Sequence, residues 1–136
     1  MNGVLLSSSF DWSVKLWCPK VTREPIFSFE SNEDYILDTK WNPMNPCFFA
    51  TGDGEGYLDL WDIGSDLEAP IVRTHTGKSA VNKLRWSLDG SKLYTGHANG
   101  EIQVHSTNKK ALEFKGDKFA ALESKIKSKS YHPKSK

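Results

Sequence analysis

The sequence predicts an all-β fold: part of a β-propeller, about two and a half four-stranded blades long, followed by a short helix and a basic tail. The main observation is an internal repeat, because residues 6–17 align with residues 50–61 at a spacing of 44, and then with residues 95–105. A second alignment agrees with the first, since Trp41 and Trp86 lie in matching segments at a spacing of 45. Repeats of this length are typical of propeller blades, which have four strands each.

Within each repeat, apolar and polar residues alternate as in a half-buried strand. Lys15 lies between Val14 and Leu16, and Asp59 lies between Leu58 and Leu60. The expected strands are 3–7, 13–17 and 25–29 in the first repeat, which lacks its innermost strand; 35–41, 47–51, 57–61 and 69–73 in the second; and 80–86, 91–95, 101–105 and 110–114 in the third. The blades are thus expected at 1–114, with an incomplete blade at 1–30, a second at 31–74 and a third at 75–114, before a helix and tail at 115–136.

The dipeptide that ends a WD40 repeat occurs once as written, Trp61-Asp62. Trp17-Cys18 and His105-Ser106 stand at the same place in the other repeats and are degenerate copies. We expect six residues to be structural. They are Trp17, Trp61 and Asp62 of these dipeptides, the matching tryptophans Trp41 and Trp86, and the turn residue Asp11.

Charge and cysteine content favour a soluble protein of the cytosol. The net charge is +1, which gives no reason to expect nucleic acid or a membrane as a partner. Charged residues within the first thirty exclude a signal peptide or membrane span there. Cys18 and Cys47 have no disulfide-type spacing, which favours a reducing compartment.

No catalytic residue, cofactor or metal site is predicted. The glycine-rich segment 52–56 precedes a strand, whereas a phosphate loop precedes a helix. The four histidines and two cysteines lack metal-ligand spacing, and no serine stands in a nucleophile-elbow motif. We therefore expect a non-enzyme in which His75 forms a hydrogen bond inside its blade and His105 packs in place of a tryptophan.

Interaction residues are better supported. Trp12 occupies the turn position that Gly56 and Gly100 hold in the other repeats, and turn geometry does not require a tryptophan there. Exposed tryptophans are favoured interface anchors, so Trp12 is the first candidate for partner contact, the alternative being that it folds onto a neighbouring blade. The further candidates, expected on the same face, are Tyr35, Asp34, Lys78 and Asn99.

The C-terminal segment is expected to be a short amphipathic helix and a basic tail. Asp117 is a candidate N-cap, and Phe119, Leu122 and Ile126 have helical spacing, so the helix is expected to pack on the last blade. The residues from Lys125 onward have too few apolar groups for an ordered structure. We expect a solvated tail, with attraction to microtubules or nucleic acid as the alternative.

These blades do not close a ring, because a closed propeller needs roughly four to eight of them. The chain is therefore expected to be a C-terminal portion of a longer protein, a truncated gene product, or a chain that pairs its open edges with another.

Three segments resemble the cytoplasmic dynein intermediate chains: residues 5–17, 49–62 and 82–90. The resemblance covers about residues 3–114. It implies a non-catalytic scaffold of the dynein motor, whose WD-repeat region docks on the dynein heavy chain among other dynein subunits, in the cytoplasm on the microtubule cytoskeleton. It also implies that light-chain and dynactin sites, which lie in an N-terminal extension of the family, are not in these residues. An axonemal intermediate chain, or an unrelated WD-repeat adaptor, remains the alternative.

Overall fold

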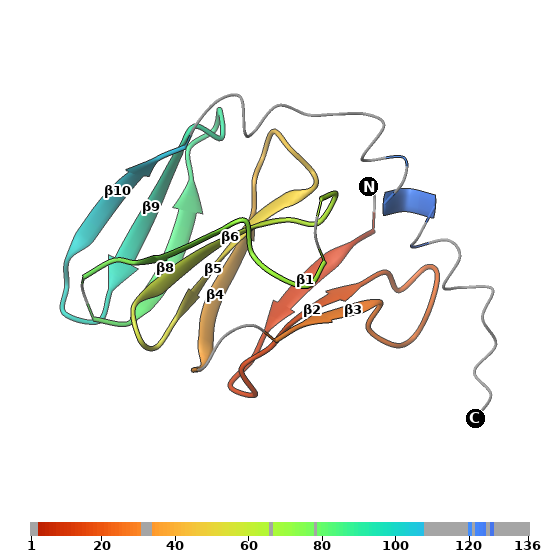
Figure 1. Ribbon diagram of the computed structural model, residues 1–136, viewed down its shortest axis with the longest axis horizontal. Helices are drawn as coiled ribbons and strands as arrows, with labels where there is room; N and C mark the ends of the chain where they lie inside the picture. The colour runs from red at the N-terminus through yellow and green to blue at the C-terminus, as the bar shows by residue number, and fades with distance from the viewer. Residues whose placement is uncertain are drawn as a thin grey trace.

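The computed structural model describes residues 3–30, 34–65, 67–77, 79–107, 120, 122–124 and 126. Three antiparallel sheets lie side by side in these residues (Figure 1). Their strands are β1 (Leu5–Ser8), β2 (Val14–Trp17) and β3 (Phe27–Phe29); β4 (Ile36–Trp41), β5 (Phe48–Asp53), β6 (Tyr57–Asp62) and β7 (Val72–His75); and β8 (Val81–Trp86), β9 (Lys92–His97) and β10 (Ile102–Ser106). The prediction of an all-β, partial propeller is confirmed. The strand expected at 110–114 and most of the tail lie outside the described residues.

The outermost strands of the first two sheets begin later than predicted, and proline accounts for the shift. Pro25 and Pro70 have no N–H to donate to a strand ladder. The residue after each proline makes the first hydrogen bond, from Ile26 N to Leu16 O and from Ile71 N to Leu60 O. β3 and β7 follow from there.

An aromatic core joins the first two sheets. Trp61 is stacked on Phe49, with ring centroids 5.8 Å apart, and Phe29 meets both rings edge-on. Val14 and Leu16 of β2 are buried in the same cluster. Interdigitation of large rings between neighbouring sheets accounts for much of the burial that holds the two sheets together.

The second and third sheets are joined by a smaller core and by directed hydrogen bonds. Leu58 of β6 is buried with Val81 and Leu84 of β8. Leu84 N donates to Asp38 Oδ2 at 2.8 Å, and Trp86 Nε1 donates to the carbonyl oxygen of Lys40 at 3.1 Å. Because these bonds connect backbone and side-chain groups of β4 and β8, they fix the stacking of one blade on the next.

The prediction that the C-terminal helix packs on the last blade is wrong. Leu122 and Ile126 are buried in the cluster that contains Val14 and Leu16 of the first sheet, and the helix lies near that end of the molecule in Figure 1. The two side chains, four residues apart, share one helix face. They are buried with Cys18, which directly follows β2, so the helix covers the core between the first two sheets.

Candidate interaction surface

The β1–β2 turn places Trp12 at the surface in a left-handed backbone conformation. Its φ is 71°, compared with 92° at Gly56 and 87° at Gly100, the equivalent residues of the other two sheets. The side chain remains 48% exposed. A left-handed conformation costs an L-residue about 1–2 kcal/mol relative to glycine, so the turn bears a cost that its glycine counterparts avoid.

Asp11 holds this turn together. Its Oδ1 accepts hydrogen bonds from Ser13 Oγ at 2.6 Å and from Ser13 N at 3.0 Å. The Ser13 hydroxyl, aided by the Ser13 amide and the Lys15 ammonium, holds the pKa of Asp11 below its ordinary value despite some desolvation. In the third sheet Asn99 stabilises the equivalent turn in the same way, since its Oδ1 accepts a hydrogen bond from Glu101 N at 3.1 Å.

Phe10 and Tyr35 form a ring pair beside this turn. Their centroids are 4.7 Å apart, and the side chains are 68% and 47% exposed. Ile36 N donates to the carbonyl oxygen of Ser9 at 3.3 Å, which ties the segment leading into β4 to the first sheet. We call the three exposed aromatic residues Phe10, Trp12 and Tyr35 the aromatic patch.

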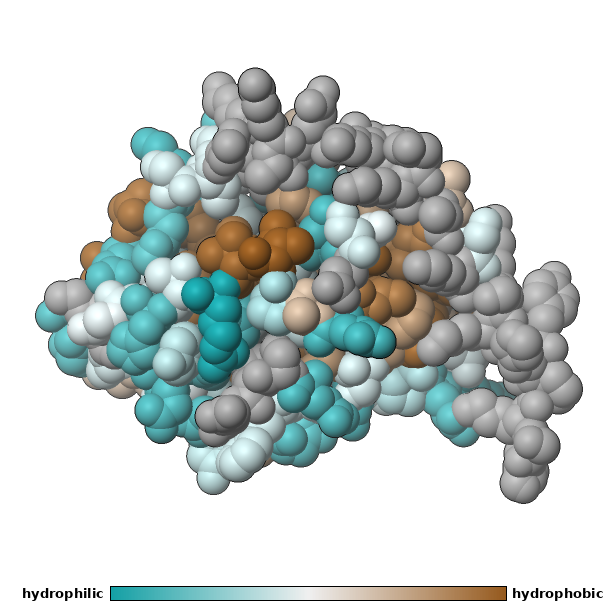
Figure 2. All heavy atoms as spheres, viewed as in Figure 1, coloured by the Kyte–Doolittle hydropathy of each residue, from teal (hydrophilic) through white to brown (hydrophobic). Residues whose placement is uncertain are grey.

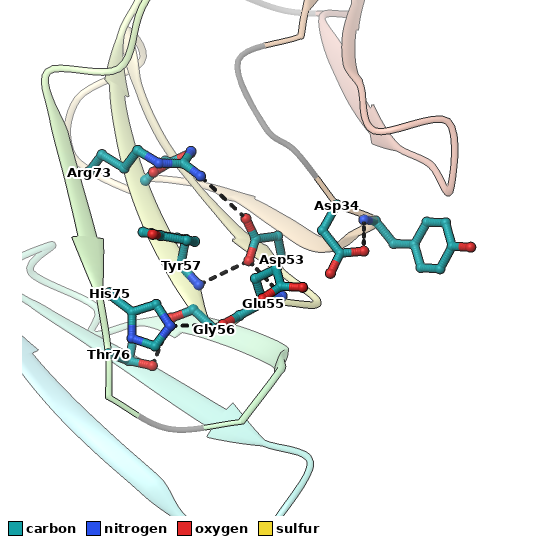
Figure 3. Close-up of polar contacts among 10 residues, drawn as sticks. Asp34, Asp53, Glu55, Gly56, Tyr57, Arg73, His75 and Thr76 are labelled. Atoms are coloured by element: carbon teal, nitrogen blue, oxygen red, sulfur yellow. Dashed lines mark hydrogen bonds and ion pairs between the residues drawn. The ribbon is translucent and has the colours of Figure 1, made fainter.

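Asp34 fixes Tyr35 against the second sheet. Its Oδ1 accepts from Tyr35 N at 2.6 Å, and Gly54 N donates to Tyr35 O at 2.9 Å. A Cβ added at Gly54 would lie 2.8 Å from Asp34 Oδ2, so the carboxylate packs closely on the β5–β6 turn (Figure 3). Tyr35 therefore has a fixed backbone and an exposed ring, which lowers the entropy that binding would cost.

The β5–β6 turn is rigid for a different reason, a buried carboxylate. Asp53 accepts from Glu55 N and Tyr57 N at 3.0 and 2.9 Å. Arg73 of β7 bridges Asp53 and Asp59, with Nη1 2.9 Å from Asp59 Oδ2, and its guanidinium lies 4.1 Å from the Tyr57 ring centroid. Figure 3 shows these groups converging beside the turn. Sequence reasoning missed this cluster, although the pairing of Arg73 opposite Asp59 across β6 and β7 was a usable signal.

His75 closes the same turn from β7. Its Nδ1 accepts from Gly77 N at 3.0 Å, so Nε2 carries the proton and donates to the carbonyl oxygen of Glu55 at 2.9 Å. Thr76 Oγ1 donates to Gly56 O at 2.8 Å. These bonds lie within one sheet, as expected for His75.

The structure brings some of the predicted interaction residues together and not others. Trp12 and Tyr35, with Asp34, lie on neighbouring sheets joined by the Ile36–Ser9 bond. Asn99 is in the exposed β9–β10 turn of the third sheet, where its N–H donates to Ser79 Oγ at 2.9 Å. Lys78 lies outside the described residues. Phe10 was not among the predicted residues. Its ring pairs with that of Tyr35, 25 residues later in the chain, and the sequence around Phe10 does not indicate this contact.

The residues expected to be structural occupy cores, sheet contacts and turns. Trp17 Nε1 donates to Ser7 Oγ at 2.8 Å, and Trp41 meets Phe49 edge-on at 5.7 Å. Asp62 accepts from Gly64 N and Ser65 Oγ in the turn after β6. In the third sheet, the residue at the tryptophan position is His105, whose Nε2 lies 3.3 Å from Thr95 Oγ1.

In the part of the chain that the structure describes, no group of three or more His, Cys, Asp or Glu side chains could hold a metal ion. Nor does any helix in those residues have the length and apolar character needed to span a bilayer.

Comparisons with known proteins agree with this architecture. Residues 69–106 match the family described as WD domain, G-beta repeat. The chain is similar to the cytoplasmic dynein 1 intermediate chain of Drosophila melanogaster, with 40% identity over 103 residues. That alignment covers 75% of this chain and 15% of the relative, so the chain spans a small part of the relative's length.

Proposed function

Since the chain is a WD-repeat protein homologous to cytoplasmic dynein intermediate chains, we propose that it is a non-catalytic scaffold that docks on the dynein heavy chain. Its place would be the cytoplasm, within the microtubule-based motor complex. Heavy-chain docking and location rest on the family resemblance. What supports a docking role in this chain itself is the aromatic patch.

The aromatic patch has the properties of an interface anchor. Phe10, Trp12 and Tyr35 are exposed together on fixed backbone, and Trp12 adopts its exposed position at a conformational cost. Aromatic residues dominate the binding energy of protein interfaces, and truncation of one such anchor costs about 2 kcal/mol or more. The strain at Trp12 is accounted for if the side chain binds a partner.

The experiment is co-purification of the tagged chain from cells, with the dynein heavy chain identified by mass spectrometry. The chain should recover the heavy chain, and Trp12→Ala should reduce recovery by roughly thirtyfold, the equivalent of about 2 kcal/mol. Met44→Ala is the matched control, because Met44 is 60% exposed in the β4–β5 turn, away from the aromatic patch.

Other outcomes would point elsewhere. An axonemal heavy chain in place of the cytoplasmic one would make the protein an axonemal intermediate chain. Recovery of a different complex, with no heavy chain, would make it an unrelated WD-repeat adaptor. Heavy-chain recovery that Trp12→Ala leaves unchanged would remove the aromatic patch from the interface.

A further inference from the structure

Carboxylates surround the aromatic patch on the turns and connections of the first two sheets. Figure 1 shows the β1–β2 turn, the start of β4 and the β5–β6 turn along the lower margin of the view, and Figure 2 shows mostly hydrophilic residues there. β3 ends at the same side, because its last residue pairs with the first residue of β2. We call four residues the acidic rim: Asp11 of the β1–β2 turn, Glu30 after β3, Asp34 before β4 and Glu55 of the β5–β6 turn.

The chain neutralises the acidic rim only in part. Lys15 Nζ lies 3.4 Å from Asp11 Oδ2, and both side chains are at least one-third exposed, so this pair is weakened by solvent. The other ion pairs that the described residues form use carboxylates outside the rim. Glu30, Asp34 and Glu55 therefore have no basic partner among those residues, and negative charge exceeds positive charge around the exposed rings.

Asp34 can accept further hydrogen bonds while it holds Tyr35. Its Oδ1 accepts from Tyr35 N at 2.6 Å. Its Oδ2 lies beside the β5–β6 turn, 2.8 Å from the position of a Cβ added at Gly54 (Figure 3). A carboxylate has about four acceptor positions, so a donor from outside the chain can bind here without displacing the Tyr35 amide.

The second sheet contains an intramolecular example of how a tyrosine and a carboxylate bind a cation. The Arg73 guanidinium lies 4.1 Å from the Tyr57 ring centroid, and its Nη1 lies 2.9 Å from Asp59 Oδ2. The ring contacts the face of the guanidinium, and the carboxylate contacts its edge, so one arginine satisfies both. Tyr35 beside Asp34 presents the same two groups, and no arginine of the described residues is in contact with them.

From these contacts we infer that the aromatic patch and the acidic rim together bind an arginine from a basic segment of a partner polypeptide, with the guanidinium on the Tyr35 ring and its N–H groups donating to Asp34. This inference rests on the proposed function, because it names the chemistry that the aromatic patch would recognise. Arginine fits better than lysine, because a planar guanidinium stacks on a ring and pairs with a carboxylate at the same time. The tail of this chain is a poorer occupant, since residues 115–136 contain seven lysines and no arginine.

The test uses the full chain and three fluorescein-labelled peptides of one Gly/Ser-rich sequence, with arginine, lysine or citrulline at the same positions. Citrulline has the shape of arginine without its charge. Fluorescence anisotropy should show saturable binding of the arginine peptide, which weakens at high salt. The arginine peptide should bind at least about tenfold more tightly than the citrulline peptide and about threefold more tightly than the lysine peptide. Equal affinity for the arginine and citrulline peptides would overturn the inference.

Single substitutions test the position of the site. Asp34→Asn keeps an acceptor for the Tyr35 amide but removes the charge, and Tyr35→Leu removes the ring; each should weaken binding of the arginine peptide about threefold or more. Asp62→Asn is the matched control, because it removes a carboxylate at the other end of β6 and should leave binding unchanged. Circular dichroism verifies that each variant remains folded. Binding that neither Asp34→Asn nor Tyr35→Leu weakens would contradict the inference.

The same variants separate this inference from the proposed function. Heavy-chain recovery that depends on Trp12 but not on Asp34, with no preference for the arginine peptide, would support the proposed function and refute the inference. Selective binding of the arginine peptide without heavy-chain recovery would support the inference and remove the heavy chain as the partner. Tighter peptide binding after the lysines at 127, 129, 134 and 136 are replaced by glutamine would assign the site to the chain's own tail and refute the inference.

Discussion

Gly52 and Gly96 occupy equivalent positions, yet the same substitution should have opposite effects at the two. The added methyl of Gly52→Ala would lie 2.5 Å from Val81 Cγ1 and 3.2 Å from the Val81 carbonyl oxygen. The side chain and backbone of β8 would both have to shift. Gly96→Ala meets no atom closer than 3.7 Å, and neither glycine has the left-handed φ that would strain an alanine.

The magnitudes follow from these distances. Overpacking of a well-packed core costs about 1–3 kcal/mol, so Gly52→Ala should lower the free energy of unfolding by about that amount. Gly96→Ala should raise it by about 0.4–1 kcal/mol, because alanine reduces the conformational entropy of the unfolded chain. The two variants should therefore differ by roughly 1.4–4 kcal/mol.

Urea unfolding followed by tryptophan fluorescence measures the difference, since the chain has five tryptophans. The midpoint should move down for Gly52→Ala and up for Gly96→Ala, with the slope unchanged in both. Equal shifts at the two positions would mean that β8 does not pack on β5 as described.

Four further predictions concern single side chains. Trp12→Gly should raise the free energy of unfolding by about 1 kcal/mol, measured by the same titration, because glycine adopts the φ of 71° without strain. Thr51→Val should be neutral or stabilising, because Thr51 Oγ1 is buried with no hydrogen-bond partner among the described residues. Thr95→Val should cost about 1–3 kcal/mol by leaving His97 Nε2, 2.9 Å from Thr95 Oγ1, unsatisfied. Burial, with a smaller contribution from His97, lowers the pKa of His105 in the folded chain. As the pH falls from the ordinary histidine pKa of 6.5 towards that lowered value, the unfolded chain therefore binds more protons than the folded chain. Stability should therefore decrease through that window and then level off, and His105→Trp should remove this part of the pH dependence of the unfolding midpoint.

The repeat made most of the fold predictable from sequence. Spacings of 44 and 45 align the strands, and comparison with the turn residues Gly56 and Gly100 identifies Trp12 as an exception from the sequence alone. What the repeat could not supply were contacts without a counterpart in another blade. The burial of Leu122 and Ile126 on the first two sheets depends on which apolar surface lies uncovered in three dimensions.

The candidate surface was predictable in the same partial way. Trp12 and Tyr35 stood out because each is a large exposed ring where the fold needs only a turn or a connection. Phe10 did not, because its significance lies in a 4.7 Å contact with a ring 25 residues later in the chain. Arg73 was missed for a similar reason, since its two carboxylate partners converge only when β5, β6 and β7 pair.

Comparison between blades of one chain separates folding requirements from other constraints. Positions with the same role in successive blades keep their character, as Trp41 and Trp86 do. Positions that change while the backbone stays the same have no folding reason for the change. Trp12 in place of glycine lowers the stability of the fold. Lys83 stands where the second sheet has Asp38, the carboxylate that accepts the Leu84 amide of β8, so the third sheet lacks that acceptor. Both differences fall at exposed sites, so neither changes the packing of the core.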